Sequence, residues 1–267
     1  MRDRFNRVLT SILLFVILGC CYFVVAGHFR HLRAADEKFS TVVGIPFQME
    51  TIPELEEIEK EIEAEIEEEP ITYVNLEVPF VSQYPELPTG CEITSLTMVM
   101  NYFGYDVAKT YMADNYMFYW QYDYQVGFLG SPYSIYGSKM LPPAIADSAN
   151  YFLQSNNSNL IATDISGMDF NNLMAYIDLK YPVIVWVTED FSEYPNWNGS
   201  VDYYNGHENY GYWGTHCIVI KGYDADSNNV IINNPQTGEQ YINRDQMARV
   251  YDAVGRYAVV VTRNEDV

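Results

Sequence analysis

The apolar positions of this chain fall into three patterns along its length. Val8 to Gly27 is an uncharged, mostly apolar run of 20 residues, long enough at the helical rise to cross a hydrocarbon core of about 30 Å. Apolar and polar residues then alternate from Val74 to Val81, which predicts a strand. From Cys91 to Phe103 the apolar residues recur with helical spacing, and Gly104 stands where a helix commonly ends.

Later patterns predict one more helix and a group of strands. Residues 169–180 have helical spacing and lead into an apolar strand, Pro182 to Thr188. A second strand runs from Gly214 to Tyr223. After a turn rich in Asp and Asn, a third strand, Val230 to Asn234, ends at a proline. The short turn between the last two strands predicts an antiparallel hairpin.

Composition and charge narrow the possible functions. The chain has 267 residues, 36 acidic against 15 basic, and a formal net charge of −21. Residues 71–267 alone carry 22 acidic and 8 basic residues. Such a surface repels phosphate backbones, so we expect no nucleic-acid partner. The 4 cysteines are too few for a disulfide scaffold and lack the paired spacing of metal ligands.

Residues 1–30 are interpreted as a cytoplasmic tip followed by a transmembrane anchor. Three arginines precede the apolar run, which favours a cytoplasmic amino terminus, although basic residues also follow it and soften that orientation. The run is longer than a usual secretory core, so we favour an uncleaved anchor. Two alternatives stay open: cleavage after Gly27, or a lipoprotein signal at Ile17 to Cys20. All three place the bulk of the chain outside the membrane, at the cell surface or secreted.

Residues 31–70 are interpreted as an acidic stalk that carries a separate domain, 71–267. The stretch 54–69 contains ten glutamates and one lysine, with isoleucine at 58, 62 and 66. That isoleucine spacing suggests a marginal amphipathic helix and leaves a partner-binding stripe open. We favour a solvated spacer, because blocks of like charge repel one another and extend.

Cys91 is the first candidate for chemistry. It lies in the first turn of the predicted helix, where the helix dipole and unpaired N–H groups stabilise an anion. That location lowers the pKa of a thiol and favours the nucleophilic thiolate. The alternative is a small buried apolar side chain, as free cysteines usually are.

A histidine partner for this thiol is available in the same domain. His207 lies in a predicted polar loop, where an exposed histidine is the simplest interpretation. His216 lies on a predicted strand, so its side chain and that of Cys217 face opposite ways. An Asn at the far end of the hairpin can reach His216 and orient the ring. A zinc site built from these cysteines and histidines is disfavoured, because residues 216 and 217 cannot converge on one ion.

Three blocks of sequence together resemble a known family. They are Gln83 followed by Leu87-Pro88-Thr89-Gly90-Cys91-Glu92, then Gly214-Thr215-His216-Cys217, then Asn234-Pro235. In this order they resemble the C39-like cysteine peptidase domain of Gram-positive bacterial surface proteins, over roughly residues 74–262. The resemblance implies an α+β, papain-like fold, in which the helix bearing the nucleophile packs on an antiparallel sheet. Here the transmembrane helix would precede that fold.

The resemblance also implies a role for each of four residues. By position, Cys91 would be the nucleophile and His216 the base. Asn234 would orient the imidazole, although the family more often has Asp there. Gln83 would supply an oxyanion-hole amide. The implied reaction is hydrolysis of a peptide, isopeptide or amide bond in a peptide or protein substrate, without metal or cofactor.

Two aromatic segments flank these blocks. Residues 116–136 are rich in Tyr, Phe and Trp without a steady period, and a second aromatic segment runs from Tyr194 to Trp213. The first segment is interpreted either as packing or as part of a substrate groove. The second is interpreted as an aromatic loop that forms a lid or a wall of the groove. Two other functions stay open for the chain: a catalytically silent binding module of the same fold, and a thiol acyltransferase that uses an amine in place of water.

Overall fold

A computed structural model describes residues 71–204 and 207–266 of the protein, and residues 70–267 form one compact unit. Its strands are β1 (Tyr73–Asn75), β2 (Leu160–Asp164), β3 (Val183–Thr188), β4 (Asn196–Tyr204), β5 (His207–Trp213), β6 (Thr215–Asp224), β7 (Asn229–Asn234), β8 (Gly238–Asn243) and β9 (Ala258–Arg263). Its helices are α3 (Cys91–Tyr102), α4 (Lys109–Asn115), α5 (Pro142–Ser155), α6 (Phe170–Asp178) and α7 (Arg244–Ala253), with a final 3-10 turn, η1 (Asn264–Asp266).

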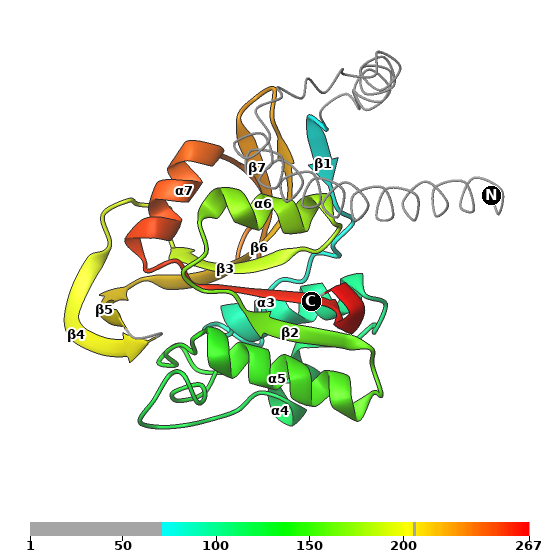
Figure 1. Cartoon of the computed structure of the whole chain (residues 1–267). Helices are drawn as coiled ribbons and strands as arrows, with labels where there is room; N and C mark the ends of the chain where they lie inside the picture. Colours follow the sequence, from blue (N-terminus) through cyan, green and yellow to red (C-terminus); the bar gives the residue numbers. More distant parts are fainter. Residues whose placement is uncertain (1–70, 205–206, 267) are drawn as a thin grey trace, which may run out of the picture. The chain divides into compact units, whose positions relative to one another are not determined.

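A mixed arrangement of helices around one antiparallel sheet forms the fold (Figure 1). The strand order is β2-β9-β3-β6-β7-β8, and β1 pairs with the far half of β6. Helix α3 packs against β6 and contacts α4 and α5, whereas α6 and α7 contact one another and β3. Figure 1 shows these two groups of helices on opposite sides of the sheet. The predicted packing of the Cys91 helix on an antiparallel sheet is confirmed.

Helix α3 is the central helix of the domain. Every residue from Cys91 to Met100 is buried, including three hydroxyl side chains and Glu92. Most polar groups buried in a protein have a hydrogen-bond partner. The Ser95 hydroxyl donates to the Cys217 carbonyl of β6, 3.2 Å away, and the Thr97 hydroxyl donates to the Ile93 carbonyl. The Thr94 hydroxyl has no partner among the described residues. Gly104, at φ +91°, follows the end of the helix as predicted.

Strand β6 organises the sheet around the hairpin that the sequence predicted. It pairs with β3 through Thr215 to Ile220 and with β7 through Val219 to Asp224. The predicted hairpin, the strand Val183–Thr188 and the helix near 169–180 are all present. The core therefore forms where the most apolar strands, β3 and β6, lie next to each other between the two helical layers.

The predicted strand from Val74 to Val81 is too long. The ladder with β6 ends at Asn75, and the last backbone bond to that strand runs from the Leu76 N–H to the Lys221 carbonyl. The Val78 N–H then donates to the Leu76 carbonyl, so the chain turns locally instead of pairing. Pro79 has no N–H to continue the ladder. The alternation of buried residues nevertheless persists as far as Val78.

The segment predicted as an aromatic loop before His216 is a β-hairpin instead. Strands β4 and β5 pair antiparallel, with Trp197 opposite Tyr212 and Val201 opposite Tyr210. His207 is the first residue of β5 and so lies in a strand rather than a polar loop. The Asn and Gly residues of this segment suggested a loop. Cross-strand aromatic pairing outweighs that local preference.

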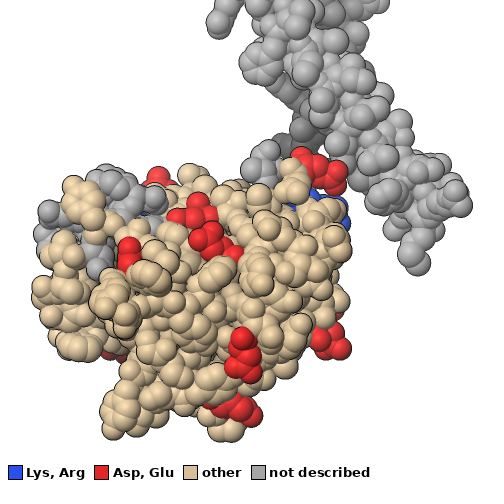
Figure 2. Space-filling model, turned by 90° about the horizontal axis from the view of Figure 1, so that it is seen from below, with Lys and Arg blue, Asp and Glu red and all other residues tan. Residues whose placement is uncertain are grey.

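Two features of the described residues bear on the wider predictions. No helix within residues 71–204 and 207–266 is both long and apolar enough to cross a membrane. The predicted anchor, 8–27, and the acidic stalk lie outside the described residues. Figure 2 shows acidic side chains scattered over one face of the domain and few basic ones there, as the net charge predicts.

Gly222 tests how closely β1 approaches β6. A Cβ at this position would lie 2.1 Å from the Val74 carbonyl oxygen, so Gly222→Ala must displace β1. We expect a loss of about 1–3 kcal/mol of unfolding free energy and a melting temperature lower by several degrees. Scanning calorimetry measures the loss, and hydrogen exchange at residues 73–76 should accelerate. Glu77→Ala, at an exposed neighbouring position, is the control. An unchanged melting temperature in Gly222→Ala would contradict this close packing.

Candidate active site

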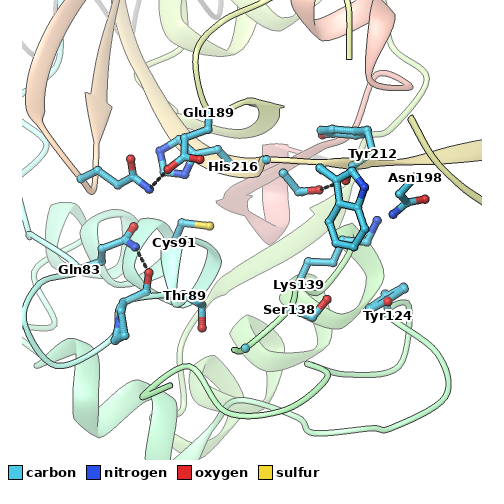
Figure 3. Close-up of a pocket in the computed structure, with 16 residues that line it drawn as sticks. Gln83, Thr89, Cys91, Tyr124, Ser138, Lys139, Glu189, Asn198, Tyr212 and His216 are labelled. Atoms are coloured by element: carbon cyan, nitrogen blue, oxygen red, sulfur yellow. Dashed lines mark hydrogen bonds between the residues drawn. The ribbon is translucent and has the colours of Figure 1, made fainter. Parts of the chain in front are cut away.

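A pocket of about 440 Å³ collects three of the four residues that the sequence singled out. Gln83, Cys91 and His216 all line it, and Figure 3 shows them around its opening. Asn234 does not line the pocket but bonds to His216 from behind. These residues come from the loop before α3, the first turn of α3, and the two strands β6 and β7. Residues separated by up to 151 positions are thereby brought to one place.

Cys91 occupies the first position of α3. The residue before it, Gly90, provides no side-chain cap, and a Cβ there would lie 2.8 Å from the Cβ of Leu87. The tight Leu87–Gly90 turn therefore fits only a glycine at its end. The first four N–H groups of a helix have no partner within it. The Cys91 N–H is one of these groups and lies beside the pocket.

The thiol of Cys91 donates a hydrogen bond to Glu92 Oε2, 3.2 Å away. Burial, the neighbouring carboxylate and Cys217 together raise the pKa of the Cys91 thiol well above its usual value. The expectation that the helix terminus lowers this pKa is therefore wrong for this state of the site. The loss of hydration and the adjacent negative charge outweigh the favourable dipole of the helix. Cys91 rests as a neutral thiol.

Glu92 is the site residue that sequence reasoning left without a role. Its side chain is 1% exposed, and Oε1 accepts the Met140 N–H at 3.0 Å. Burial raises the pKa of Glu92 to about 7, against the opposing effects of its own backbone N–H, the Met140 N–H, the Cys91 thiol and Lys139. An acidic residue in a helix's first turn usually marks a solvated terminus. The signal that could have identified it is its place beside Cys91 in a helix with no polar face.

His216 is buried and is held in one tautomer by Asn234. Its Nε2 lies 2.8 Å from Asn234 Oδ1. The Gln236 N–H donates to the same Oδ1, which identifies that atom as the amide oxygen. Because a carbonyl oxygen only accepts, Nε2 carries the proton and Nδ1 keeps its lone pair. Burial lowers the pKa of His216, whereas the bond to Asn234 and the nearby Glu189 carboxylate raise it.

The two asparagines at the end of β7 face opposite sides of the sheet, as strand parity predicts. Asn234 bonds to His216, and its Nδ2 donates to Gln240 Oε1. Asn233 instead donates to the Val78 carbonyl, 2.9 Å away. Both asparagines are buried. The amide of Asn234 is thus fixed on both sides, and it fixes the imidazole plane in turn.

Gln83 is buried at the edge of the pocket. Its backbone N–H donates to the Pro235 carbonyl, directly after Asn234, so the loop before α3 is tied to the end of β7. The side-chain Nε2 donates to the Pro88 carbonyl at 2.7 Å, which leaves a second N–H on the same nitrogen. Oε1 has no hydrogen-bond partner among the described residues. The amide is held in place, with hydrogen-bonding capacity to spare.

The structure brings Cys91 and His216 to the same pocket without a hydrogen bond between them. Within residues 71–204 and 207–266, the bond that the thiol donates goes to Glu92, and the bonded ring nitrogen of His216 faces Asn234. Cys217, which strand parity places away from His216, is buried and raises the pKa of Cys91. Burial and the Glu92 carboxylate in turn raise the pKa of Cys217. Both cysteines are free thiols.

The two aromatic segments supply the wall opposite α3. Tyr124 comes from the segment 116–136, and Tyr212 and Trp213 come from the hairpin. The Lys139 ammonium lies 4.8 Å from the Tyr124 ring centre and 5.9 Å from that of Tyr212, which are cation–π distances. Next to Lys139, the Met140 carbonyl accepts the indole N–H of Trp186. This wall is therefore anchored in the core.

The side chains of this pocket have the chemistry of a nucleophilic centre. Across the described part of the chain, no three His, Cys, Asp or Glu side chains gather closely enough to hold a metal ion. A thiol at a helix terminus, an imidazole with a free Nδ1 and two amide donors can together perform acyl transfer.

Comparisons with known proteins place the chain among similar sequences and folds. The family described as "Peptidase_C39 like family" matches residues 75–259. The uncharacterized protein YvpB of Bacillus subtilis (strain 168) is 26% identical over 197 residues, which cover 67% of this chain and 71% of that protein. A crystal structure from Bacillus anthracis described as a "putative C39-like peptidase" superposes with a TM-score of 0.61 at 24% identity, covering 72% of this chain and 98% of that one.

The Asn234 bond predicts a pH effect at His216. In Asn234→Asp, a carboxylate replaces the amide oxygen, and Gln240 can rotate its own amide to donate to the second oxygen. An adjacent negative charge favours imidazolium, so we expect the pKa of His216 to rise by about one unit or more. The pKa is measured by NMR titration of the His216 imidazole signal, which is assigned by its absence from the spectrum of His216→Gln. Asn229→Asp makes the same charge change elsewhere on β7 and is the control. An equal shift of the His216 pKa in that variant would contradict a local effect of residue 234.

Proposed function

We propose that the protein, which belongs to the Peptidase_C39 like family, is a cysteine peptidase. Its substrate is a peptide or protein, and Cys91, His216, Asn234 and Gln83 perform the hydrolysis of a peptide, isopeptide or amide bond. No metal or cofactor takes part. Family membership and the fold shared with the Bacillus anthracis C39-like peptidase support the reaction class. The roles of the four residues are our inference from the geometry.

One observation carries the proposal. A single pocket is lined by a thiol at a helix terminus, an imidazole and a buried glutamine amide, and an asparagine oxygen fixes the tautomer of the imidazole. Nδ1 of His216 is therefore the nitrogen available to accept a proton. General-base activation of a thiol needs that free lone pair.

The reaction begins with transfer of the Cys91 proton to His216 Nδ1. The sulfur forms a bond to the substrate carbonyl carbon, and the carbonyl electrons move to the oxygen. The Gln83 amide and the Cys91 N–H stabilise the resulting oxyanion. When the intermediate collapses, the C–N bond breaks and His216 gives its proton to the leaving amine. A water, deprotonated by His216, then hydrolyses the thioester and restores the thiol.

The resting protonation state affects how the reaction starts. Burial raises the pKa of Cys91 and lowers that of His216, so both groups are neutral before substrate enters. Asn234 and Glu189 favour the imidazolium that forms during attack. Thus the proton moves in the course of the reaction, and the protein does not store a preformed ion pair. The thiol must also leave its hydrogen bond to Glu92 before it can react.

Hydrolysis of an internally quenched peptide library by the full chain in detergent tests this function. Cys91→Ala and His216→Ala should abolish cleavage. Gln83→Ala should lower kcat by about 10²–10³-fold, because it removes an oxyanion donor. Gln154→Ala, which removes an exposed glutamine side chain that does not line this pocket, is the control and should retain activity. Cleavage that persists in Cys91→Ala would disprove the mechanism.

A catalytically silent binding module is the second candidate. It is favoured by one observation, the neutral Cys91 thiol that bonds to Glu92 rather than to His216. In that case the library stays uncleaved, although peptides still bind to the pocket. A thiol acyltransferase would instead join an added amine to the acyl group. Mass spectrometry of the products separates the transferase from the hydrolase.

We also propose that residues 8–27 anchor the protein in the membrane, with the domain outside the cytoplasm on an acidic stalk. The uncharged 20-residue run and the preceding arginines support this orientation. In a bacterial host, the full chain should resist alkaline extraction from membranes, whereas a chain lacking residues 1–30 should not.

Protease added to protoplasts should digest the domain of the full chain. If the mass of the mature protein shows that residues 1–27 are missing, the segment is a cleaved signal peptide rather than an anchor. Release from the membrane by Cys20→Ala, with the adjacent Cys21→Ala as control, would indicate a lipoprotein instead.

A further inference from the structure

Glu92 contacts the sulfur that the proposed mechanism uses, yet that mechanism gives it no role. One carboxylate oxygen accepts the Cys91 thiol proton at 3.2 Å, and the other accepts the Met140 N–H at 3.0 Å. The side chain is 1% exposed. Burying a carboxylate is unfavourable unless its hydrogen bonds and charge partners offset the loss of hydration, and a buried glutamine or apolar residue would lose less hydration. This arrangement calls for a reason beyond packing.

The groups around Glu92 show what its charge acts on. Cys91 precedes it on α3, and Cys217 of β6 lies near enough for the carboxylate to raise its pKa. Lys139, next to Met140 in the segment before α5, attracts the carboxylate. A charged Glu92 disfavours the thiolate form of both cysteines. The Lys139 ammonium, in contrast, favours the charged form of Glu92. The strongest chemical effect of the carboxylate therefore falls on the Cys91 sulfur.

We propose that Glu92 is a positioning residue that holds the Cys91 thiol in a resting state, in competition with His216, and that protonation of Glu92 releases it. This inference rests on the proposed role of His216. While Glu92 is charged, the thiol proton stays on sulfur and points to the carboxylate. Once Glu92 has taken a proton from solvent, it no longer accepts from the thiol. The Cys91 proton is then free to move to His216 Nδ1.

The pH at which this release occurs follows from burial. Because burial raises the pKa of Glu92 to about 7, the carboxyl is neutral in mildly acidic solution and charged above neutrality. A charged Glu92 opposes the thiolate and a neutral one does not. The thiol is therefore released as the pH falls through about 7, and it is held as the pH rises.

A purely structural role would give a different result in Glu92→Gln. Glutamine keeps an oxygen that accepts the Met140 N–H and therefore preserves the tie between α3 and the pocket wall. It removes the charge beside the sulfur. If Glu92 serves only to fasten that wall, the glutamine variant should behave as the wild type at every pH.

The test is the rate of Cys91 alkylation by iodoacetamide in the full chain, followed by mass spectrometry of the Cys91 peptide from about pH 5.5 to 9. Wild type, Glu92→Gln and the exposed control Glu77→Gln are compared, and circular dichroism confirms folding. At about pH 5.5 the Glu92→Gln and wild-type rates should agree. At about pH 8 Glu92→Gln should react about tenfold faster, the change expected for one unit of thiol pKa. A ratio that is the same at all pH values would overturn the proposal.

A measurement on the wild-type chain covers the case in which Glu92→Gln fails to fold. Infrared difference spectra should show a protonated carboxyl band that titrates between about pH 6 and 8 and changes frequency in Cys91→Ala, which removes the thiol donor. If no carboxyl titrates in that range, the proposal is wrong.

The alkylation assay also separates this inference from the proposed function. A pH-dependent ratio in a protein that cleaves no peptide would keep the role of Glu92 and reject the peptidase. A flat ratio in an active peptidase would reject only the role of Glu92.

Discussion

Burial of the first turn of α3 against β6 is the constraint on which the rest of the site depends. It carries Cys91 to the pocket, and the Ser95 bond to the Cys217 carbonyl fixes the helix on the strand that also bears His216. The same packing buries Glu92, whose side chain is 1% exposed. The nucleophile and its carboxylate neighbour therefore enter the core together, and each changes the protonation of the other.

Hydrogen bonds then connect the three chain segments that form the site. The loop before α3 is tied to the end of β7 through Gln83 and Pro235, and Asn234 is held between His216 and Gln240. Glu92 and Trp186 hold the backbone of Met140 from two sides. Each wall of the pocket is thus supported from the core, so its polar groups stay in place without substrate. Such preorganisation is what electrostatic catalysis requires.

The errors in prediction share one cause, which is that local sequence reveals neither the pairing partners of a segment nor its burial. The alternation from Val74 to Val81 resembles a strand, yet β6 offers partners only as far as Leu76. The Asn and Gly residues between 194 and 213 resemble a loop, yet Trp197 and Tyr212 meet across a hairpin. The pKa of Cys91 was misjudged because the dipole of a helix can be inferred from sequence, whereas its burial cannot.

The sequence by itself determined the helix that begins at Cys91, the hairpin that bears His216 and Asn234, and the family to which three separated blocks point. These features depend on short-range periodicity, turn residues and strand parity, which are local properties of the chain. Only the tertiary structure decided that Glu92 is the hydrogen-bond partner of Cys91 and that thiol and imidazole rest uncharged. Protonation depends on desolvation and on charges brought together from distant segments, and neither exists until the chain has folded.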